Sequence, residues 1–113
     1  MEAPVKNEEK EIVDLWNRYK ADKSVELRNE IVLKYTWLVQ KIVLRFKGSY
    51  SNFAQLDDMV NQGIIALIDA VERYDPDLGN IFESFASLKI KGAIIDFMRK
   101  QDWVPRNQRS LAK

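Results

Sequence analysis

Apolar residues recur along the chain at the three- and four-residue spacing of amphipathic helices, and no pair of segments alternates in the manner of a β-hairpin. The pattern predicts helices at about Lys6–Lys20, Ser24–Gly48, Leu56–Asp75 and Ile81–Lys100. Pro105 suits the first turn of a further helix, because its fixed φ and missing N–H are tolerated there. The prediction is an all-α fold, a compact helical bundle of about four helices plus the start of a fifth.

Short polar stretches mark where these helices begin and end. Ser24 is a typical N-cap residue, and Glu26 follows in the first turn, where a carboxylate suits the helix dipole. Residues 48–55 read as a loop. Because proline disfavours helical geometry in the residue before it, the third helix is expected to end at Asp75, with a turn at residues 77–80 leading to the fourth helix.

The third helix carries an isoleucine on its polar side. Ile65 is surrounded there by amides and carboxylates, and Ile68 lies between the two faces. This arrangement is typical of a small interface with a polar rim, but a single exposed isoleucine is also common on surface helices. The expected core stripe comprises Leu56, Val60, Gly63, Leu67, Val71 and Tyr74, and the polar face comprises Asp58, Asn61, Gln62, Asp69 and Glu72.

The fourth helix has two faces that differ from those of an ordinary surface helix. Its expected buried stripe comprises Phe82, Ala86, Ile90, Ala93, Ile94 and Phe97. Off that stripe lie Phe85, Leu88, Gly92, Ile95 and Arg99, with Lys89 and Asp96 close by. Aromatic rings interleaved with cations are typical of single-stranded nucleic-acid binding, and a glycine inside a helix suggests that something approaches the backbone closely. The alternative is that helices on both sides bury this segment in a larger core.

Composition excludes several kinds of chemistry. The 113 residues include no cysteine and no histidine, which removes disulfides, thiolate metal sites and the commonest general base. Asp57 and Asp58 are adjacent, so on a helix they point about 100° apart and do not form a catalytic carboxylate pair. The chain is therefore expected to be non-enzymatic, with no cofactor and no metal.

Charge is distributed unevenly along the chain. Residues 1–88 carry a net charge of −4, and residues 89–113 carry +5, although the whole chain is only +1. A basic end of this kind either binds a polyanion or is simply a solvated helix end. Trp103 stands beside these basic residues, where its ring either packs under the turn or lies against DNA.

Nothing in the sequence indicates a membrane or a secretory route. No apolar run approaches the roughly 20 residues of a membrane span, and the acidic N-terminus is unlike a signal peptide. A cytoplasmic location is expected. From the residues alone, a helical protein-interaction adaptor, whose basic end docks an acidic partner, is an alternative to nucleic-acid binding.

The stretch LDDMVNQGIIALIDAVERYDPDLGNIFESFASLKIKGAIIDFMRKQDWVPR, Leu56 to Arg106, resembles region 2 of bacterial sigma factors. Its GAIID and DWVPR segments look like the alternative class that drives flagellar and motility genes. The segment RNEIVLKYTWLVQKIV looks like the start of the same region, so the likeness covers about Val13 to Arg109. The resemblance implies one region 2 domain over residues 1–113, with the beginning of region 3 at about 105–113.

The resemblance also implies partners. A region 2 domain binds RNA polymerase core through a coiled coil of the β′ subunit, and it recognises and opens the −10 promoter element on the non-template strand. An anti-sigma factor is a further implied partner. Members of the family continue into a second domain that reads the −35 element, so this chain is expected to be a fragment or to lack that half of promoter recognition.

Positions carried over from the family fall on the two unusual helix faces. The implied polymerase-binding residues are Asp58, Asn61, Gln62, Ile65 and Ile68. On the fourth helix, Phe85 would stack on a flipped base, and Leu88 and Lys89 stand where primary sigma factors have two tryptophans. Lys89 and Lys91 replace arginines of the motility class, keeping the charge for phosphates but losing bidentate contact with guanine. The implied DNA-binding residues are Phe85, Leu88, Lys89, Lys91, Gly92, Ile95, Asp96, Arg99, Arg106 and Arg109.

Overall fold

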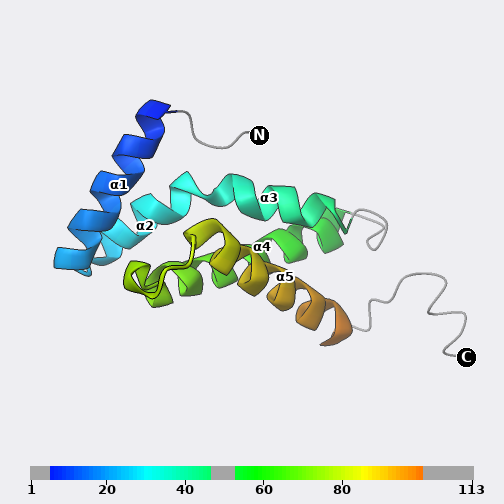
Figure 1. Ribbon diagram of the computed structural model, residues 1–113. Coiled ribbons are helices and arrows are strands. Elements are labelled where there is room, and N and C mark those ends of the chain that lie inside the picture. The colour runs from blue at the N-terminus through cyan, green and yellow to red at the C-terminus, as the bar shows by residue number, and fades with distance from the viewer. Residues whose placement is uncertain (1–5, 47–52, 101–113) are drawn as a thin grey trace, which may run out of the picture.

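The computed structural model describes residues 6–46 and 53–100, and all the regular structure in these ranges is helical (Figure 1). The α-helices are α1 (Lys6–Ala21), α2 (Val25–Lys34), α3 (Thr36–Leu44), α4 (Phe53–Arg73) and α5 (Phe82–Lys100), and a 3₁₀ turn, η2, spans Pro76–Leu78. The predicted all-α class is confirmed. The further helix predicted at Pro105 lies outside the described residues.

The predicted second helix, Ser24–Gly48, is wrong as a single element, because the chain breaks at Tyr35 into α2 and α3. Tyr35 has φ −116° and ψ 9°, and its N–H donates to the Val32 carbonyl at 3.0 Å, a tight turn that ends α2. The Thr36 hydroxyl donates to the Leu33 carbonyl at 3.3 Å and so competes with the helical ladder at the same point. The described residues therefore contain five α-helices, where the sequence predicted four.

The other boundaries follow local chemistry. The Leu27 N–H donates to Ser24 Oγ at 3.1 Å, which confirms the predicted N-cap of α2. The helix predicted from Leu56 begins earlier, at Phe53, and ends at Arg73. In the turn before α5, the Asp77 N–H donates to Asp75 Oδ1 at 2.9 Å, and Gly79 adopts a left-handed conformation with φ 84°.

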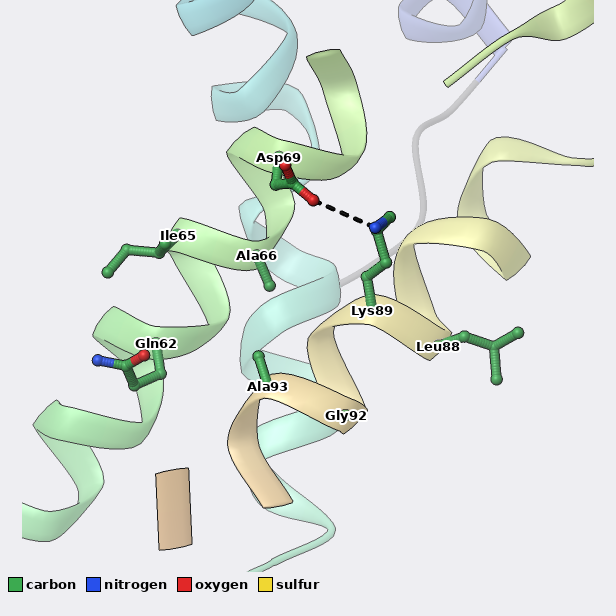
Figure 2. Close-up of a pocket in the computed structure, with 8 residues that line it drawn as sticks. All are labelled: Gln62, Ile65, Ala66, Asp69, Leu88, Lys89, Gly92 and Ala93. Carbon is green, nitrogen blue, oxygen red and sulfur yellow. Dashed lines mark hydrogen bonds and ion pairs between the residues drawn. The ribbon is translucent and has the colours of Figure 1, made fainter. Parts of the chain in front are cut away.

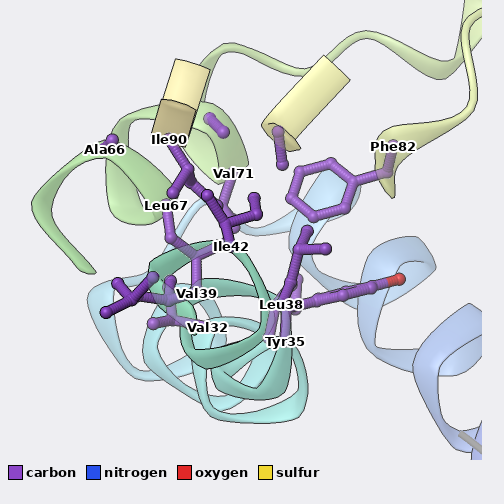
Figure 3. Close-up of a cluster of buried hydrophobic side chains, with 14 of the residues drawn as sticks. Val32, Tyr35, Leu38, Val39, Ile42, Ala66, Leu67, Val71, Phe82 and Ile90 are labelled. Carbon is purple, nitrogen blue, oxygen red and sulfur yellow. The ribbon is translucent and has the colours of Figure 1, made fainter. Parts of the chain in front are cut away.

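Helix α4 is central to the packing, because it contacts α2, α3 and α5, while α1 packs on α2 (Figure 1). Figure 3 shows side chains of α2, α3, α4 and α5 meeting in one core, with Leu67 and Val71 of α4 among Val39, Ile42 and Ile90. Gly63 lets α3 and α4 approach closely: a Cβ built there would lie 2.6 Å from Val39 Cγ1. The largest side chains that are almost wholly buried are Ile31, Met59, Leu67, Ile90, Ile94, Val39, Val43 and Val71.

An aromatic cluster joins the start of α5 to the first half of the chain. The Phe82 ring lies 5.0 Å from Trp16, 4.7 Å from Tyr35 and 5.2 Å from Tyr74, measured between ring centroids. The Tyr74 hydroxyl donates to the Asn80 carbonyl at 2.6 Å and so ties the end of α4 to the residues before α5. This cluster holds the N-terminal end of α5 in place against the end of α4.

No helix in the described part of the chain is both long enough and apolar enough to cross a membrane.

Candidate functional site

The outer face of α4 is open, as the sequence predicted. The Ile65 side chain is 59% exposed, and Asp58 and Asn61 are exposed on the same helix. Gln62 is half-buried, and Ile68 is half-buried against the core. The structure thus leaves an aliphatic side chain in a polar surround on the surface, with Ile68 turned partly inward.

The second face of α5 is also open. Leu88 is 73% exposed, Gly92 is exposed, and Ile95 is only half-buried. Lys91, Asp96 and Arg99 are exposed as well, and Asp96 pairs with Lys100 at 3.1 Å. In the described structure, the alternative in which helices on both sides bury this segment is therefore wrong. Arg106, Arg109 and Trp103 lie outside the described residues.

The two open faces meet at a groove between α4 and α5 (Figure 2). The groove has a volume of about 480 Å³. Figure 2 shows Ala66 and Ala93 between the two helices, with Ile65 and Leu88 directed outward on opposite sides. The groove is lined by Gln62, Ile65, Ala66 and Asp69 from α4 and by Leu88, Lys89, Gly92 and Ala93 from α5. Residues predicted to bind two different partners therefore border one depression.

Gly92 has no packing role in the described structure. A Cβ built on Gly92 meets no atom within 4 Å, in contrast to Gly63. Glycine inside a helix costs about 1 kcal/mol relative to alanine. The close approach that the sequence suggested at Gly92 is therefore not made by another part of the described chain.

Phe85 is half-buried and has neighbours of two kinds. Its ring lies 5.8 Å from the Tyr74 ring, at an interplanar angle of 43°. The ammonium of Lys89, one turn further along α5, lies 5.5 Å from the centre of the Phe85 ring, a distance at which a cation is attracted by the aromatic face. The aromatic ring and the cation that the sequence placed on one helix face are thus in contact.

The same lysine forms an ion pair across the groove. Lys89 Nζ lies 3.1 Å from Asp69 Oδ2, and Arg73 Nε donates to Asp69 Oδ1 at 2.7 Å (Figure 2 shows the Lys89 pair). The hydrogen bond from Arg73 lowers the pKa of the Asp69 carboxyl, partial burial opposes this shift, and the bond from Lys89 lowers the pKa further. Asp69 therefore stays ionised between two cations.

Asp69 is the residue at this site whose contacts the sequence did not reveal. The helical pattern placed it only in the polar ring around Ile65. Its contact with Lys89 depends on how α4 and α5 pack, and the two residues stand 20 positions apart. In the part of the chain that the structure describes, no group of acidic, histidine or cysteine side chains could hold a metal ion.

The sequence of this chain is similar to those of several known proteins. Residues 31–104 match the family model described as Sigma-70 region 2. The chain is 36% identical over 99 residues to the RNA polymerase sigma-D factor of Bacillus subtilis, which covers 88% of the chain and 39% of that protein. It is similarly 33% identical over 95 residues to the RNA polymerase sigma factor FliA of Pseudomonas aeruginosa, covering 84% of the chain and 37% of that protein.

The chain is also 40% identical over 80 residues to RNA polymerase sigma factor FliA of Escherichia coli strain K12, which covers 71% of the chain and 34% of that protein. The chain thus spans less than two fifths of the length of these curated relatives.

Proposed function

Because the chain belongs to the sigma-70 region 2 family, we propose that it binds RNA polymerase core and recognises and melts the −10 promoter element, as part of a sigma factor of the motility class. The observation that carries the proposal is the pair of open faces bordering the α4–α5 groove. The proposal assigns no catalytic group to the chain, and the polymerase supplies the chemistry.

The α4 face is assigned to polymerase. Ile65 offers an exposed apolar centre, and Asp58, Asn61 and Gln62 supply polar groups around it on successive turns. A small apolar centre with a hydrogen-bonding rim suits a helical partner such as a coiled coil. Half-buried Ile68 contributes the edge of this surface and also packs on the core.

The α5 face is assigned to the non-template strand. Extruding a base from the duplex costs a few kcal/mol of stacking and pairing, and stacking on an aromatic ring returns about 1–3 kcal/mol. Phe85 supplies the ring, and the lysines and Arg99 attract phosphates. Leu88 is exposed on the same helix, and a Cβ built on Gly92 meets no atom within 4 Å, so both positions are accessible to a partner.

The motility class is proposed from the relatives and from the sequence of α5. The relatives compared above carry the names sigma-D and FliA. Asp96 and Arg99, which the resemblance assigns to the upstream part of the −10 element, are both exposed one and two turns beyond Gly92. These side chains are therefore accessible to DNA that follows α5 toward its C-terminal end.

The DNA assignment is tested by replacing the ring. Phe85→Ala is expected to weaken binding of a labelled −10 non-template oligonucleotide by roughly 5- to 150-fold, the equivalent of one lost stacking contact. Binding is measured by fluorescence anisotropy with core polymerase present. Phe97→Ala is the matched control, because Phe97 is another half-buried phenylalanine of α5 outside the assigned set. Equal affinity for the wild type and Phe85→Ala would contradict the assignment and favour the adaptor alternative.

The polymerase assignment is tested by placing a charge at the apolar centre. Ile65→Glu buries an unpaired carboxylate in any interface formed there, so binding to core polymerase should fall by at least tenfold. Leu33→Glu is the control, because Leu33 is 71% exposed on α2 and receives the same charge. If both variants bind core polymerase as the wild type does, the α4 face is not the polymerase site.

A further inference from the structure

The positive charge of Lys89 is paired with a carboxylate of the same chain, Asp69. Lys89 reaches across the groove from α5 to α4, and its ammonium lies 3.1 Å from the Asp69 carboxylate (Figure 2). Its side chain is 33% exposed. A phosphate that bound Lys89 would therefore have to take the place of Asp69 as the partner of the ammonium.

The position of Lys89 also affects the ring beside it. The ammonium lies 5.5 Å from the centre of the Phe85 ring, while Asp69 holds the same ammonium from the other helix. A base that stacks on the Phe85 face occupied by Lys89 must displace the ammonium from that face. One ion pair thus opposes both a phosphate contact and a stacking contact.

The restraint is weak enough to be reversed by a ligand. Ion pairs between partly exposed side chains contribute little to stability, because water and salt screen both charges. Asp69 is also satisfied by Arg73 at 2.7 Å, so losing Lys89 leaves its carboxylate hydrogen-bonded. Exchange of Asp69 for a phosphate therefore leaves no charge without a partner.

From this arrangement we propose that Asp69 limits the DNA affinity of the chain by holding Lys89 against α4, away from phosphates and over the Phe85 ring. The inference rests on the proposed function, because it requires that DNA is bound along α5. Asp69 is in this view a positioning residue that acts through Lys89. Neither the sequence pattern nor the family resemblance had assigned it a role in DNA binding.

The test is the isosteric variant Asp69→Asn, measured with the 113-residue chain and a labelled single-stranded −10 non-template oligonucleotide. If the substitution frees the Lys89 ammonium to bind one phosphate, the plot of the logarithm of the association constant against the logarithm of the salt concentration becomes steeper by about 0.7. At about 0.1 M monovalent salt, the same contact corresponds to roughly fivefold tighter binding. The salt slope is the decisive reading, because a purely structural effect of the substitution would not steepen it.

Two further variants separate the pair from general charge effects. Glu72→Gln also removes one carboxylate from α4, but Glu72 pairs with Arg28 of α2 at 2.8 Å, so it should leave the salt slope unchanged. In a Lys89→Met background, Asp69→Asn should give no further gain in affinity. Circular dichroism of each variant confirms that the helices are retained.

The outcomes distinguish this inference from the proposed function. If Phe85→Ala weakens binding but Asp69→Asn leaves it unchanged or lowers it, Asp69 does not restrain Lys89, and the DNA assignment stands. A gain that persists without Lys89 would also overturn the inference, because it would come from Arg73 or from net charge. If Phe85→Ala has no effect on binding, the proposed DNA site itself fails.

Discussion

Adding one methyl group at each of two glycines should change the stability of the fold in opposite directions. At Gly63 the new Cβ would lie 2.6 Å from Val39 Cγ1 and 3.5 Å from Ile90 Cγ2. Carbon atoms in contact prefer about 3.5–4.0 Å. Val39 is wholly buried and β-branched, so its side chain has little freedom to turn away. At Gly92 the new Cβ meets nothing within 4 Å.

The size of each effect follows from two opposing terms. Replacing glycine by alanine inside a helix stabilises it by about 1 kcal/mol. Overpacking a core costs about 1–3 kcal/mol, and the short contact at Val39 favours the upper end of that range. Gly63→Ala should therefore destabilise the fold by about 2 kcal/mol, which lowers Tm by about 8 °C. Gly92→Ala should stabilise it by about 1 kcal/mol and raise Tm by about 4 °C.

Thermal unfolding followed by the helix signal in circular dichroism measures both shifts, about 8 °C downward for Gly63→Ala and about 4 °C upward for Gly92→Ala. The double variant Gly63→Ala, Val39→Ala tests the cause, because removing the Val39 methyls relieves the overlap. Its loss of stability should be smaller than the sum of the two single losses by about 1–2 kcal/mol. A Gly63→Ala Tm equal to or above that of the wild type, or strict additivity with Val39→Ala, would refute the close approach of α3 and α4.

Two other predictions concern the site. The hydrogen bonds from Arg73 and Lys89 lower the pKa of Asp69, so the stability gained from the ionised carboxylate is present above about pH 4 and is lost as the pH falls through the lowered pKa. The difference in Tm between the wild type and Asp69→Asn should therefore shrink as melts are taken from about pH 6 down to about pH 3. A difference in Tm that stays constant over this range would contradict the prediction. Gly92→Ala should stabilise the fold but weaken binding of the −10 oligonucleotide in anisotropy titrations. The reason is that no other part of the described chain approaches the Gly92 backbone, which leaves DNA as the partner that does so. Unchanged binding would remove Gly92 from the site.

Most of the helices could be predicted from the sequence, because each carries its own apolar stripe and its own end signals. Ser24 and the Asp75–Pro76 step act locally, so their effects do not depend on the rest of the fold. The break at Tyr35 could not be predicted in this way. The apolar spacing continues from α2 into α3, and the Tyr35 ring packs on Phe82, a residue far away in the sequence.

The candidate site could be predicted one helix at a time. Exposed Ile65 and exposed Leu88 both follow from where their helices place them relative to the core stripe. The groove that joins the two faces and the Asp69–Lys89 pair depend on the packing of α4 against α5, which periodicity does not determine. Small side chains at Ala66 and Ala93 leave the space between the helices, and their size has meaning only once the helices are docked.

We propose above that core polymerase and one strand of a −10 element bind neighbouring faces of this chain. The most direct test of this proposal is competition between a −10 non-template oligonucleotide and a scrambled oligonucleotide of the same composition, with core polymerase present. We expect the wild-type chain to prefer the −10 sequence, Phe85→Ala to lose this preference, and Ile65→Glu to remove the effect of adding polymerase. Equal binding of the two oligonucleotides by the wild-type chain and core polymerase would contradict the proposal.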